Sequence, residues 1–466
     1  MALVLIGFMG AGKTTLARRL GGVDTDDLLG EPAEDLFDRL GEDGFRAREE
    51  ETVLAALGSG AEVIALGGGA CGSPRVRAAL ADHTVAWLDV DLDTAWDRAA
   101  GAGRPLARDR DVFAARFAER QALYEELADV VVMPGGELGG ERPGPGEKLI
   151  CSPVHPVWVG RAPQSRDGDF LVSDEHVAPL HAPGAFVIPA GEERKTLETA
   201  EGVWREMARQ GITRSGRIVA VGGGVVGDLA GFCAATYQRG IPVVHVPTTL
   251  VAQVDSAYGG KTGVDIPEAK NYVGAYHQPD AVHVLPGVLE TLPAAERAAG
   301  YAEVVKTALI AGGPLWERVR AGAVDDPATI LACARTKLGI VAADERDGGI
   351  RQVLNLGHTV GHAIETVTGY GRYRHGEAVG LGMLAALRLS GQDTLRGEVA
   401  ALLAAQGLPI ALENADAAAV ADATHRDKKR TGASTPFVLV EAPGRVTPGH
   451  EVAETDLLAA VRELAA

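Results

Sequence analysis

The chain of 466 residues is longer than one ordinary hydrophobic core supports, which predicts two or three domains. Hydrophobic residues make up 46% and charged residues 23%, a balance typical of globular proteins that excludes a disordered chain. The formal net charge of −18 argues against nucleic acid and acidic membranes as partners, so an anionic substrate needs local clusters of Arg and Lys.

The cysteines and apolar runs indicate the compartment. The four cysteines lie far apart with no CxxC pair, which predicts reduced thiols and no thiolate zinc site. No apolar run approaches the ~20 residues of a membrane span, and the LVLIG run near the first residue is too short for a signal-peptide core. We therefore expect a cytoplasmic protein with no membrane partner.

The pattern of strands and helices predicts an α/β protein in several parts. Strand-like runs (LVLIG, EVIALGGG, TVAWLDV, DVVVM) alternate with helical stretches over residues 1–133, which predicts a parallel sheet with helices on both faces. Residues 134–148 are crowded with Gly and Pro and are expected to be a linker. A second α/β domain is expected over residues 149–293, and an all-helical domain over residues 294–466, where Ala- and Leu-rich periodicity replaces strands.

The first predicted turn carries a phosphate-binding motif. GFMGAGKT fits G-x-x-x-x-G-K-[ST] between a strand and a helix, the context that this motif requires. Backbone N–H groups would hold the phosphates of ATP, Lys13 would reach the β- and γ-phosphates, and the Thr14 hydroxyl would bind Mg²⁺. The expected nucleotide contacts are Gly10, Gly12, Lys13, Thr14 and Thr15.

The phosphoryl acceptor has to be read from the rest of the first domain. Asp24 and Asp26 alternate at a predicted strand end, so both carboxylates can face the phosphates, although a helix-capping Asp explains the pattern equally well. Each nearby arginine, taken alone, is a surface residue.

Taken together and in order, the segments DTD, GFR, GGG, RPL and ERxxLYEE resemble shikimate kinase over residues 1–133. The resemblance implies that shikimate is bound by Asp26, Arg46, Gly68, Gly69 and Arg120. The two arginines would hold its carboxylate through paired N–H···O bonds, and Asp26 would orient or deprotonate the attacking hydroxyl. Asp24 would help to hold Mg²⁺, and Arg104 would contact the transferring phosphoryl group from a lid.

The first domain departs from that family at two places. The lid segment is shorter, and DVVVM leads into the Gly/Pro stretch where the family has an adenine-contacting loop and a closing helix. An alternative therefore stays open, in which this domain senses ATP and regulates its neighbour.

The second domain has a glycine run and the third has histidines. RIVAVGGGVVGD follows a predicted strand and enters a helix, which fits either a dinucleotide site or a tightly packed turn. Glu303, His358, His362 and His375 lie in apolar helical segments, and a Glu with two His is a usual zinc set. From the residues alone, His358 and His362 are the first choice because they lie one helical turn apart. Lysines and arginines around them suggest a multiply anionic substrate, such as a sugar phosphate oxidised with a nicotinamide and a metal.

Over residues 150–466 nearly every block resembles 3-dehydroquinate synthase, including VPTTLVAQVDSAYGGKTGVD, KNYVGAYHQP, AEVVKTA, RQVLNLGHTVGHAIE and HGEAVG. This resemblance implies a Rossmann-like NAD-binding domain, a helical metal-binding domain and a dimer. It assigns zinc or cobalt to Glu303, His358 and His375 instead of the helical pair. It assigns NAD to Glu192, Lys195, Gly223, Gly224, Asp228, Thr248, Thr249 and Thr291. The substrate contacts that it implies are Asp255, Lys261, Asn271, Lys306, Lys337, Arg351, Asn355, His362 and Lys428, with Arg239 from a neighbouring subunit.

The implied function is bifunctional. The kinase would phosphorylate shikimate, and the synthase would convert 3-deoxy-D-arabino-heptulosonate 7-phosphate to 3-dehydroquinate and phosphate, both in aromatic amino acid biosynthesis. Asp347, where the synthase family usually has Glu, is a small departure beside the site. The alternatives to the synthase are another sugar-phosphate cyclase or a zinc polyol dehydrogenase.

Overall fold

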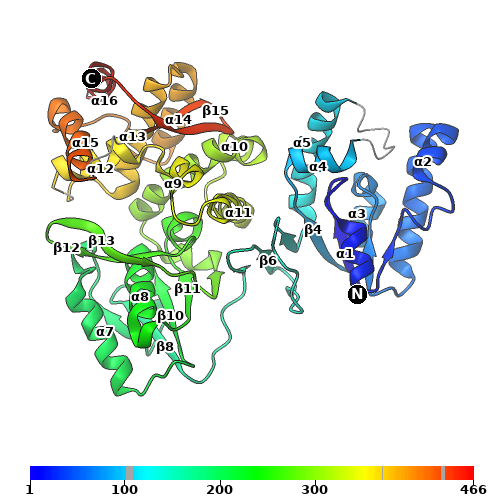
Figure 1. Cartoon of the computed structure of the whole chain (residues 1–466), viewed down its shortest axis with the longest axis horizontal. Coiled ribbons are helices and arrows are strands. Elements are labelled where there is room, and N and C mark those ends of the chain that lie inside the picture. The colour runs from blue at the N-terminus through cyan, green and yellow to red at the C-terminus, as the bar shows by residue number, and fades with distance from the viewer. Residues whose placement is uncertain (101–108, 370, 432–435, 466) are drawn as a thin grey trace. The chain divides into compact units, whose positions relative to one another are not determined.

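The computed structural model describes residues 1–100, 109–369, 371–431 and 436–465. The chain forms two compact units, Met1–Gly160 and Arg161–Ala466. In Figure 1 the first unit is drawn in blue to cyan, and the second runs from green to red. The unit boundary therefore follows residue 160, whereas the sequence placed the end of the linker at residue 148. The difference arises because the chain returns to the first sheet after the Gly/Pro stretch and adds two strands to it.

The first unit is a sheet flanked by helices, with strands in the order β2-β3-β1-β4-β5-β6-β7. The strands are β1 (Leu3–Ile6), β2 (Val23–Asp24), β3 (Val63–Ala65), β4 (Thr84–Leu88), β5 (Val130–Val132), β6 (Lys148–Cys151) and β7 (Val157–Val159). The helices are α1 (Lys13–Arg19), α2 (Ala33–Gly58), α3 (Pro74–Leu80), α4 (Leu92–Ala99) and α5 (Arg110–Leu127), with a 3-10 turn η1 (Ala70–Gly72).

The pairing in this sheet is parallel from β2 to β6, and only β7 runs antiparallel to its neighbour β6. The predicted parallel sheet is confirmed, and its strands are apolar runs because helices bury both faces. The carboxyl ends of β1, β2 and β3 lie at one edge, where ligands bind in such sheets.

The second unit begins with a five-stranded parallel arrangement in the order β14-β11-β10-β8-β9. Its strands are β8 (Asp169–Asp174), β9 (Phe186–Ile188), β10 (Arg217–Gly222), β11 (Val243–Pro247) and β14 (Ala281–Val284), and a hairpin is formed by β12 (Lys261–Ile266) and β13 (Ala269–Tyr276). The connecting helices are α6 (Ala178–His181), α7 (Leu197–Arg209) and α8 (Gly224–Thr236), with short turns η3 (Glu192–Arg194), η4 (Tyr237–Arg239), η5 (Ala252–Ser256) and η6 (Pro286–Thr291). Helices α7 and α8 lie against this sheet (Figure 1), and their apolar side chains pack on it to form its core.

The rest of this unit is mainly helical. Its elements are α9 (Ala294–Ala311), α10 (Gly313–Arg320), α11 (Pro327–Ala343), η7 (Ile350–Asn355), α12 (His358–Val367), α13 (His375–Leu389), α14 (Asp393–Ala405), α15 (Ala417–Thr431) and α16 (Glu454–Leu464). The expectation of an all-helical part needs one correction, because β15 (Phe437–Ala442) and β16 (Arg445–His450) form an antiparallel hairpin there. Among the described residues, no helix has both the length and the apolar composition to cross a bilayer.

Candidate active sites

The loop between β1 and α1 has the contacts of a phosphate-binding loop. The Lys13 ammonium, which is buried, donates hydrogen bonds to the carbonyl oxygens of Gly7 at 2.8 Å and Phe8 at 3.1 Å. Arg98 of α4 donates to the carbonyl of Gly10 at 3.1 Å, so α4 also reaches this loop. The predicted residues Gly10, Gly12, Lys13, Thr14 and Thr15 therefore share one loop and helix start at the carboxyl end of β1.

The two aspartates lie at the end of β2, on the same edge of the parallel sheet as this loop. Asp24 is buried, and its Oδ1 accepts a hydrogen bond from the Asp26 backbone N–H at 2.9 Å, so Asp24 also closes its own turn. Asp26 is exposed, and its Oδ1 would lie 2.8 Å from a Cβ added at Gly67. The structure thus brings Asp26 to the glycine turn that follows β3.

Two arginines from different helices reach that same glycine turn. Arg46 of α2 lies against Gly69, where an added Cβ would be 2.0 Å from its Nη1. Arg120 of α5 donates from Nη1 to the carbonyl of Gly68 at 2.6 Å. Asp26, Arg46, Gly68, Gly69 and Arg120 therefore come together as the resemblance implies. Arg104 lies outside the described residues.

Sequence reasoning missed two side chains that fix these arginines. Glu49 is 5% exposed and accepts a hydrogen bond from Arg46 Nη1 at 2.5 Å. The Tyr124 hydroxyl donates at 2.7 Å to the same Gly68 carbonyl that Arg120 contacts, and burial raises the pKa of this phenol. The spacing of Glu49 from Arg46, and of Tyr124 from Arg120, could have predicted these neighbours, because residues three or four apart on a helix lie side by side.

In the second unit, the glycine turn after β10 packs closely against its neighbours at the carboxyl ends of β10 and β11. A Cβ at Gly223 would lie 2.9 Å from the side chain of Thr249, so glycine lets the backbone approach Thr249 this closely. The Thr248 hydroxyl oxygen is buried without a hydrogen-bond partner among the described residues. Gly223, Gly224, Thr248 and Thr249 thus line one sheet edge, which fits a dinucleotide.

The buried Lys195 forms ion pairs with carboxylates next to this edge. Lys195 Nζ lies 2.8 Å from Glu192 and 3.2 Å from Asp228, and burial alone would lower its pKa. The carboxylates outweigh burial and raise the Lys195 pKa, while burial raises the pKa of Asp228 to about 6. Thr291 of η6 pairs with His181 of α6 at 2.7 Å instead of joining this cluster.

Three helices bring a metal-ligand set together. Glu303 of α9, His358 at the start of α12 and His375 at the start of α13 each offer a ligand atom, and these atoms lie within 4.8 Å of one another. Glu303 Oε1 is 3.7 Å from His358 Nε2 and 3.6 Å from His375 Nε2, close to the roughly 3.3 Å between ligand atoms of tetrahedral zinc. This oxygen is buried and has no hydrogen-bond partner among the described residues, so the donor set fits a divalent cation.

The pKa values of His358 and Glu303 agree with that fit. Burial is the largest effect on His358 and lowers its pKa well below the usual value, which favours the neutral imidazole that a metal needs. Burial would raise the pKa of Glu303, but Lys306 and the two imidazoles hold it well below the usual value. Burial would lower the pKa of His375, but Glu303 and Glu365 outweigh it and raise this pKa to about 10, so a cation bound there has to displace a proton. The pair His358 and His362 has ring centroids 5.3 Å apart but shares no ligand group among the described residues.

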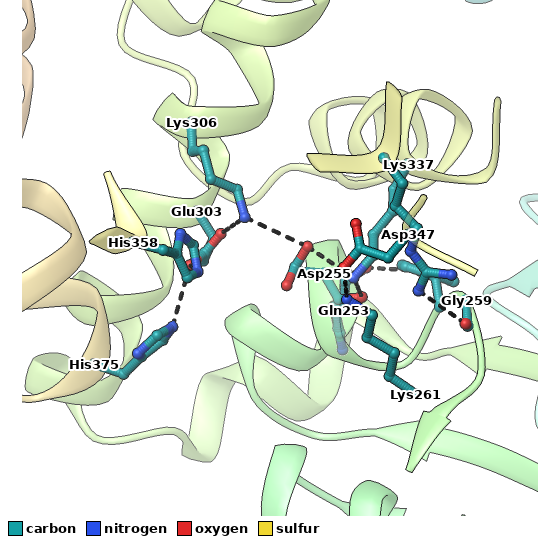
Figure 2. A network of polar contacts seen from close by, with 12 residues as sticks. Gln253, Asp255, Gly259, Lys261, Glu303, Lys306, Lys337, Asp347, His358 and His375 are labelled. Atoms are coloured by element: carbon teal, nitrogen blue, oxygen red, sulfur yellow. Dashed lines mark hydrogen bonds and ion pairs between the residues drawn. The ribbon is translucent and has the colours of Figure 1, made fainter. Parts of the chain in front are cut away.

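A network of buried cations continues from the metal set (Figure 2). Lys306 Nζ lies 2.5 Å from Glu303 Oε2 and 3.7 Å from Asp255 Oδ1, and Lys337 Nζ lies 2.8 Å from the same Asp255 oxygen. Burial lowers the pKa of Lys337, and Lys306 lowers it further although Asp255 opposes this. Arg351 is buried and donates to the carbonyl of Gly259 at 2.9 Å. Two carboxylates thus face three buried cations, which leaves positive charge for an anion.

The other predicted substrate residues lie around this network or apart from it. Lys261 of β12 pairs with Asp347, and Asn271 of β13 has a left-handed φ of 53°. Asn355 and His362 are exposed, and the His362 ring centroid is 5.9 Å from that of His375. Arg239 is exposed in η4. Lys428 belongs to α15, but its side chain lies outside the described residues.

Comparison with protein families agrees with both sites. The shikimate kinase family model matches residues 9–138. The models for the N-terminal and C-terminal parts of 3-dehydroquinate synthase match residues 185–299 and 300–430.

Individual relatives match the second unit. A 3-dehydroquinate synthase of Desulforamulus reducens is 38% identical over 347 residues, covering 66% of this chain and 97% of that protein. One of Halorhodospira halophila is 47% identical over 301 residues, covering 60% and 85%. A solved 2-deoxy-scyllo-inosose synthase, complexed with carbaglucose-6-phosphate, NAD⁺ and Co²⁺, has a TM-score of 0.59 at 26% identity and covers 68% of this chain and 99% of its own. The chain therefore belongs to the 3-dehydroquinate synthase family and carries a shikimate kinase domain ahead of the synthase.

Proposed function

We propose that the chain carries out two reactions of aromatic amino acid biosynthesis. The first unit transfers a phosphoryl group from ATP to shikimate, giving shikimate 3-phosphate. The second unit converts 3-deoxy-D-arabino-heptulosonate 7-phosphate to 3-dehydroquinate and phosphate. The observation that carries the proposal is the convergence of Glu303, His358 and His375 beside a buried network of cations.

In the kinase, the proposed roles follow from position and charge. The loop and Lys13 hold the ATP phosphates, while Thr14 and Asp24 hold Mg²⁺, directly or through water. The guanidinium groups of Arg46 and Arg120, fixed on adjacent glycines, hold the planar carboxylate of shikimate. Asp26, exposed beside Gly67, orients the attacking hydroxyl, and Arg104 is assigned to the transferring phosphoryl group.

In the synthase, NAD is assigned to the edge formed by Gly223, Gly224, Thr248 and Thr249, with Lys195, Glu192 and Asp228 beside it and Thr291 further along. Zinc or cobalt is assigned to Glu303, His358 and His375. When bound, NAD takes up and returns a hydride, and the divalent cation polarises the substrate hydroxyl beside it.

The remaining residues of the synthase site bind and orient the substrate. Lys337 and Arg351 supply the buried positive charge for the phosphate and carboxylate, with Lys261, Asn271, Asn355 and Lys428 assigned around them. Lys306 bridges the metal set and the Asp255 carboxylate, so it holds both in one arrangement. The exposed His362 is assigned to the phosphate end, where it can hold a proton. Because the hydride returns to the substrate, the net reaction is a phosphate elimination with ring closure, which is a lyase reaction.

The test is a pair of assays on the purified full-length protein. Incubation with ATP and shikimate is expected to give shikimate 3-phosphate by mass spectrometry. Incubation with the heptulosonate phosphate, NAD and Co²⁺ is expected to release phosphate and give 3-dehydroquinate. ATP turnover without shikimate 3-phosphate would instead support a regulatory first unit, and absence of dehydroquinate would refute the synthase assignment.

We also propose a homodimer formed through the synthase unit, in a cytoplasmic protein. The dimer is supported by the resemblance, which brings Arg239 to a neighbouring site, and by the exposure of this residue. All four cysteines are among the described residues and none forms a disulfide, in keeping with a reducing compartment. Mixing Arg239→Ala with Lys337→Ala subunits, each inactive alone, is expected to restore part of the synthase activity in mixed dimers. No recovery after exchange would refute the shared site.

A further inference from the structure

In both histidines of the metal set, an oxygen atom of another residue lies close to the ring nitrogen that faces away from Glu303. His358 Nδ1 lies 3.2 Å from the backbone carbonyl of Leu356. His375 Nδ1 lies 3.5 Å from Oε1 of Glu365. In both rings, Nε2 is the nitrogen that faces Glu303, so Nδ1 is available to carry the proton.

Glu365 occupies a position where a carboxylate is costly. It lies on α12, the helix that begins with His358, and it is only 6% exposed. Burying an ionised carboxylate is unfavourable unless it is paired, and its ion pair here is with His375. If the position served packing alone, an apolar residue would fill it at lower cost.

We propose that Glu365 is a positioning residue for the metal site, which holds His375 with its proton on Nδ1 and its Nε2 lone pair toward the cation. The inference rests on the proposed assignment of the metal to Glu303, His358 and His375. An acceptor on the far nitrogen fixes the tautomer and the ring orientation, and a carboxylate also makes the imidazole a stronger donor. Glu365 would supply a negative charge where Leu356 supplies a neutral dipole to His358.

A competing arrangement uses the same residue as a ligand. His362, Glu365 and His375 also offer ligand atoms that lie within 4.8 Å of one another. In that arrangement the cation would sit on the Nδ1 side of His375, and His362 would be required for metal binding. In our proposal His362 is dispensable for metal binding, so the two arrangements predict different results.

The experiment measures Co²⁺ affinity of the metal-free full-length protein by chelator competition, together with the visible absorption of bound Co²⁺. We expect Glu365→Gln to weaken Co²⁺ binding by roughly 10- to 100-fold, with Glu365→Ala at least as weak, while saturating Co²⁺ restores a 1:1 complex. His362→Ala is expected to bind within twofold of the parent. The matched control is Glu398→Gln on α14, which changes a half-exposed glutamate whose one ion pair within the described part of the chain is with Arg320, and it should leave affinity unchanged.

Each contrary outcome has a separate meaning. Affinity of Glu365→Ala within twofold of the parent would overturn the positioning role. A loss in His362→Ala equal to that in Glu365→Ala would make Glu365 a ligand and also overturn it. Unchanged affinity in His358→Ala would refute the underlying metal assignment instead. Circular dichroism of each variant separates loss of folding from loss of metal.

Discussion

The arginines of the kinase site depend on neighbouring side chains for their direction. Arg46 would otherwise be a long, mobile side chain, and Glu49 holds its guanidinium against Gly69. Arg120 shares the Gly68 carbonyl with Tyr124, which ties the glycine turn to α5. At the scale of single residues, Glu49 and Tyr124 therefore keep the two arginines in place, and neither needs to contact shikimate itself.

We expect Glu49→Gln to impair the use of shikimate without affecting the use of ATP. The change keeps the size of the side chain but removes the charge that pairs with Arg46, a bond worth about 1.5–3 kcal/mol. Steady-state kinetics should show kcat/KM for shikimate lower by roughly 10- to 100-fold, and KM for ATP unchanged. Equal effects on both substrates would contradict this role of Glu49.

A buried histidine is expected to make the first unit sensitive to acid. His155, in the turn between β6 and β7, is 3% exposed, and burial lowers its pKa from 6.5 to about 4. Because the unfolded chain binds this proton more readily, the stabilisation is present above pH 6.5 and is lost as pH falls toward 4. The shift corresponds to about 3 kcal/mol.

His155→Leu should flatten that pH dependence. Thermal unfolding can be followed by tryptophan fluorescence, because Trp158 of β7 is buried and follows His155 closely in the sequence. The parent is expected to lose more stability than the variant between pH 6.5 and 4.5, whatever their difference at neutral pH. Parallel curves for the two proteins would show that another group is responsible.

At the scale of elements, close helix contacts through glycine let the proposed metal ligands meet. Gly376, the second residue of α13, packs so tightly on α9 that an added Cβ would lie 1.8 Å from the carbonyl oxygen of Ala299. Gly382 packs in the same way on Gly357, just before α12. Because Glu303, His358 and His375 sit on these three helices, the spacing of the helices sets the spacing of the ligands.

Gly376→Ala is expected to push α13 away from α9 and to weaken Co²⁺ binding and lower Tm together. Overpacking of this kind typically costs about 1–3 kcal/mol. Gly397→Ala in α14 is the matched control, because a Cβ there meets no atom within 4 Å and alanine should add up to about 1 kcal/mol of helix stability. Co²⁺ titration and thermal unfolding distinguish the two, and an unaffected Gly376→Ala protein would refute the spacing argument.

At the scale of the whole molecule, each site is built within one compact unit. Every described residue assigned to the kinase lies in Met1–Gly160, and every one assigned to the synthase lies in Arg161–Ala466. The two reactions are not consecutive, since dehydroquinate must be dehydrated and reduced before it becomes shikimate. Direct transfer of an intermediate between the two sites therefore brings no evident benefit.

Single substitutions should accordingly separate the two activities. Lys13→Ala removes the cation of the phosphate-binding loop and is expected to abolish shikimate phosphorylation while leaving the synthase rate unchanged. His358→Ala removes a proposed metal ligand and is expected to do the reverse. Both rates are measured on the same preparation of each variant, and loss of both activities from either change would show that the units are coupled.

The elements and family of this chain followed from its sequence because their signals are local. The GFMGAGKT loop, the apolar strands of the first sheet and the helices around the histidines each depend on residues within one short segment. The choice between His362 and His375 as the metal ligand did not follow from helix spacing and needed the resemblance. The hairpin β15–β16 and the strand β6 also escaped sequence reasoning, since short strands beside Gly and Pro carry little pattern. Strand β7 was expected, but as part of the second α/β domain and not of the first sheet.

The residues along the chain already specify its chemistry: a phosphate-binding loop, a set of possible metal ligands and enough basic residues for anionic substrates. Which side chains meet became known from the folded chain, as with Glu303 and His375, Glu365 and His375, or Tyr124 and Gly68. The physical reason is that these contacts join separate elements, whose approach is set by packing, including glycines such as Gly376 that leave space for a neighbouring backbone.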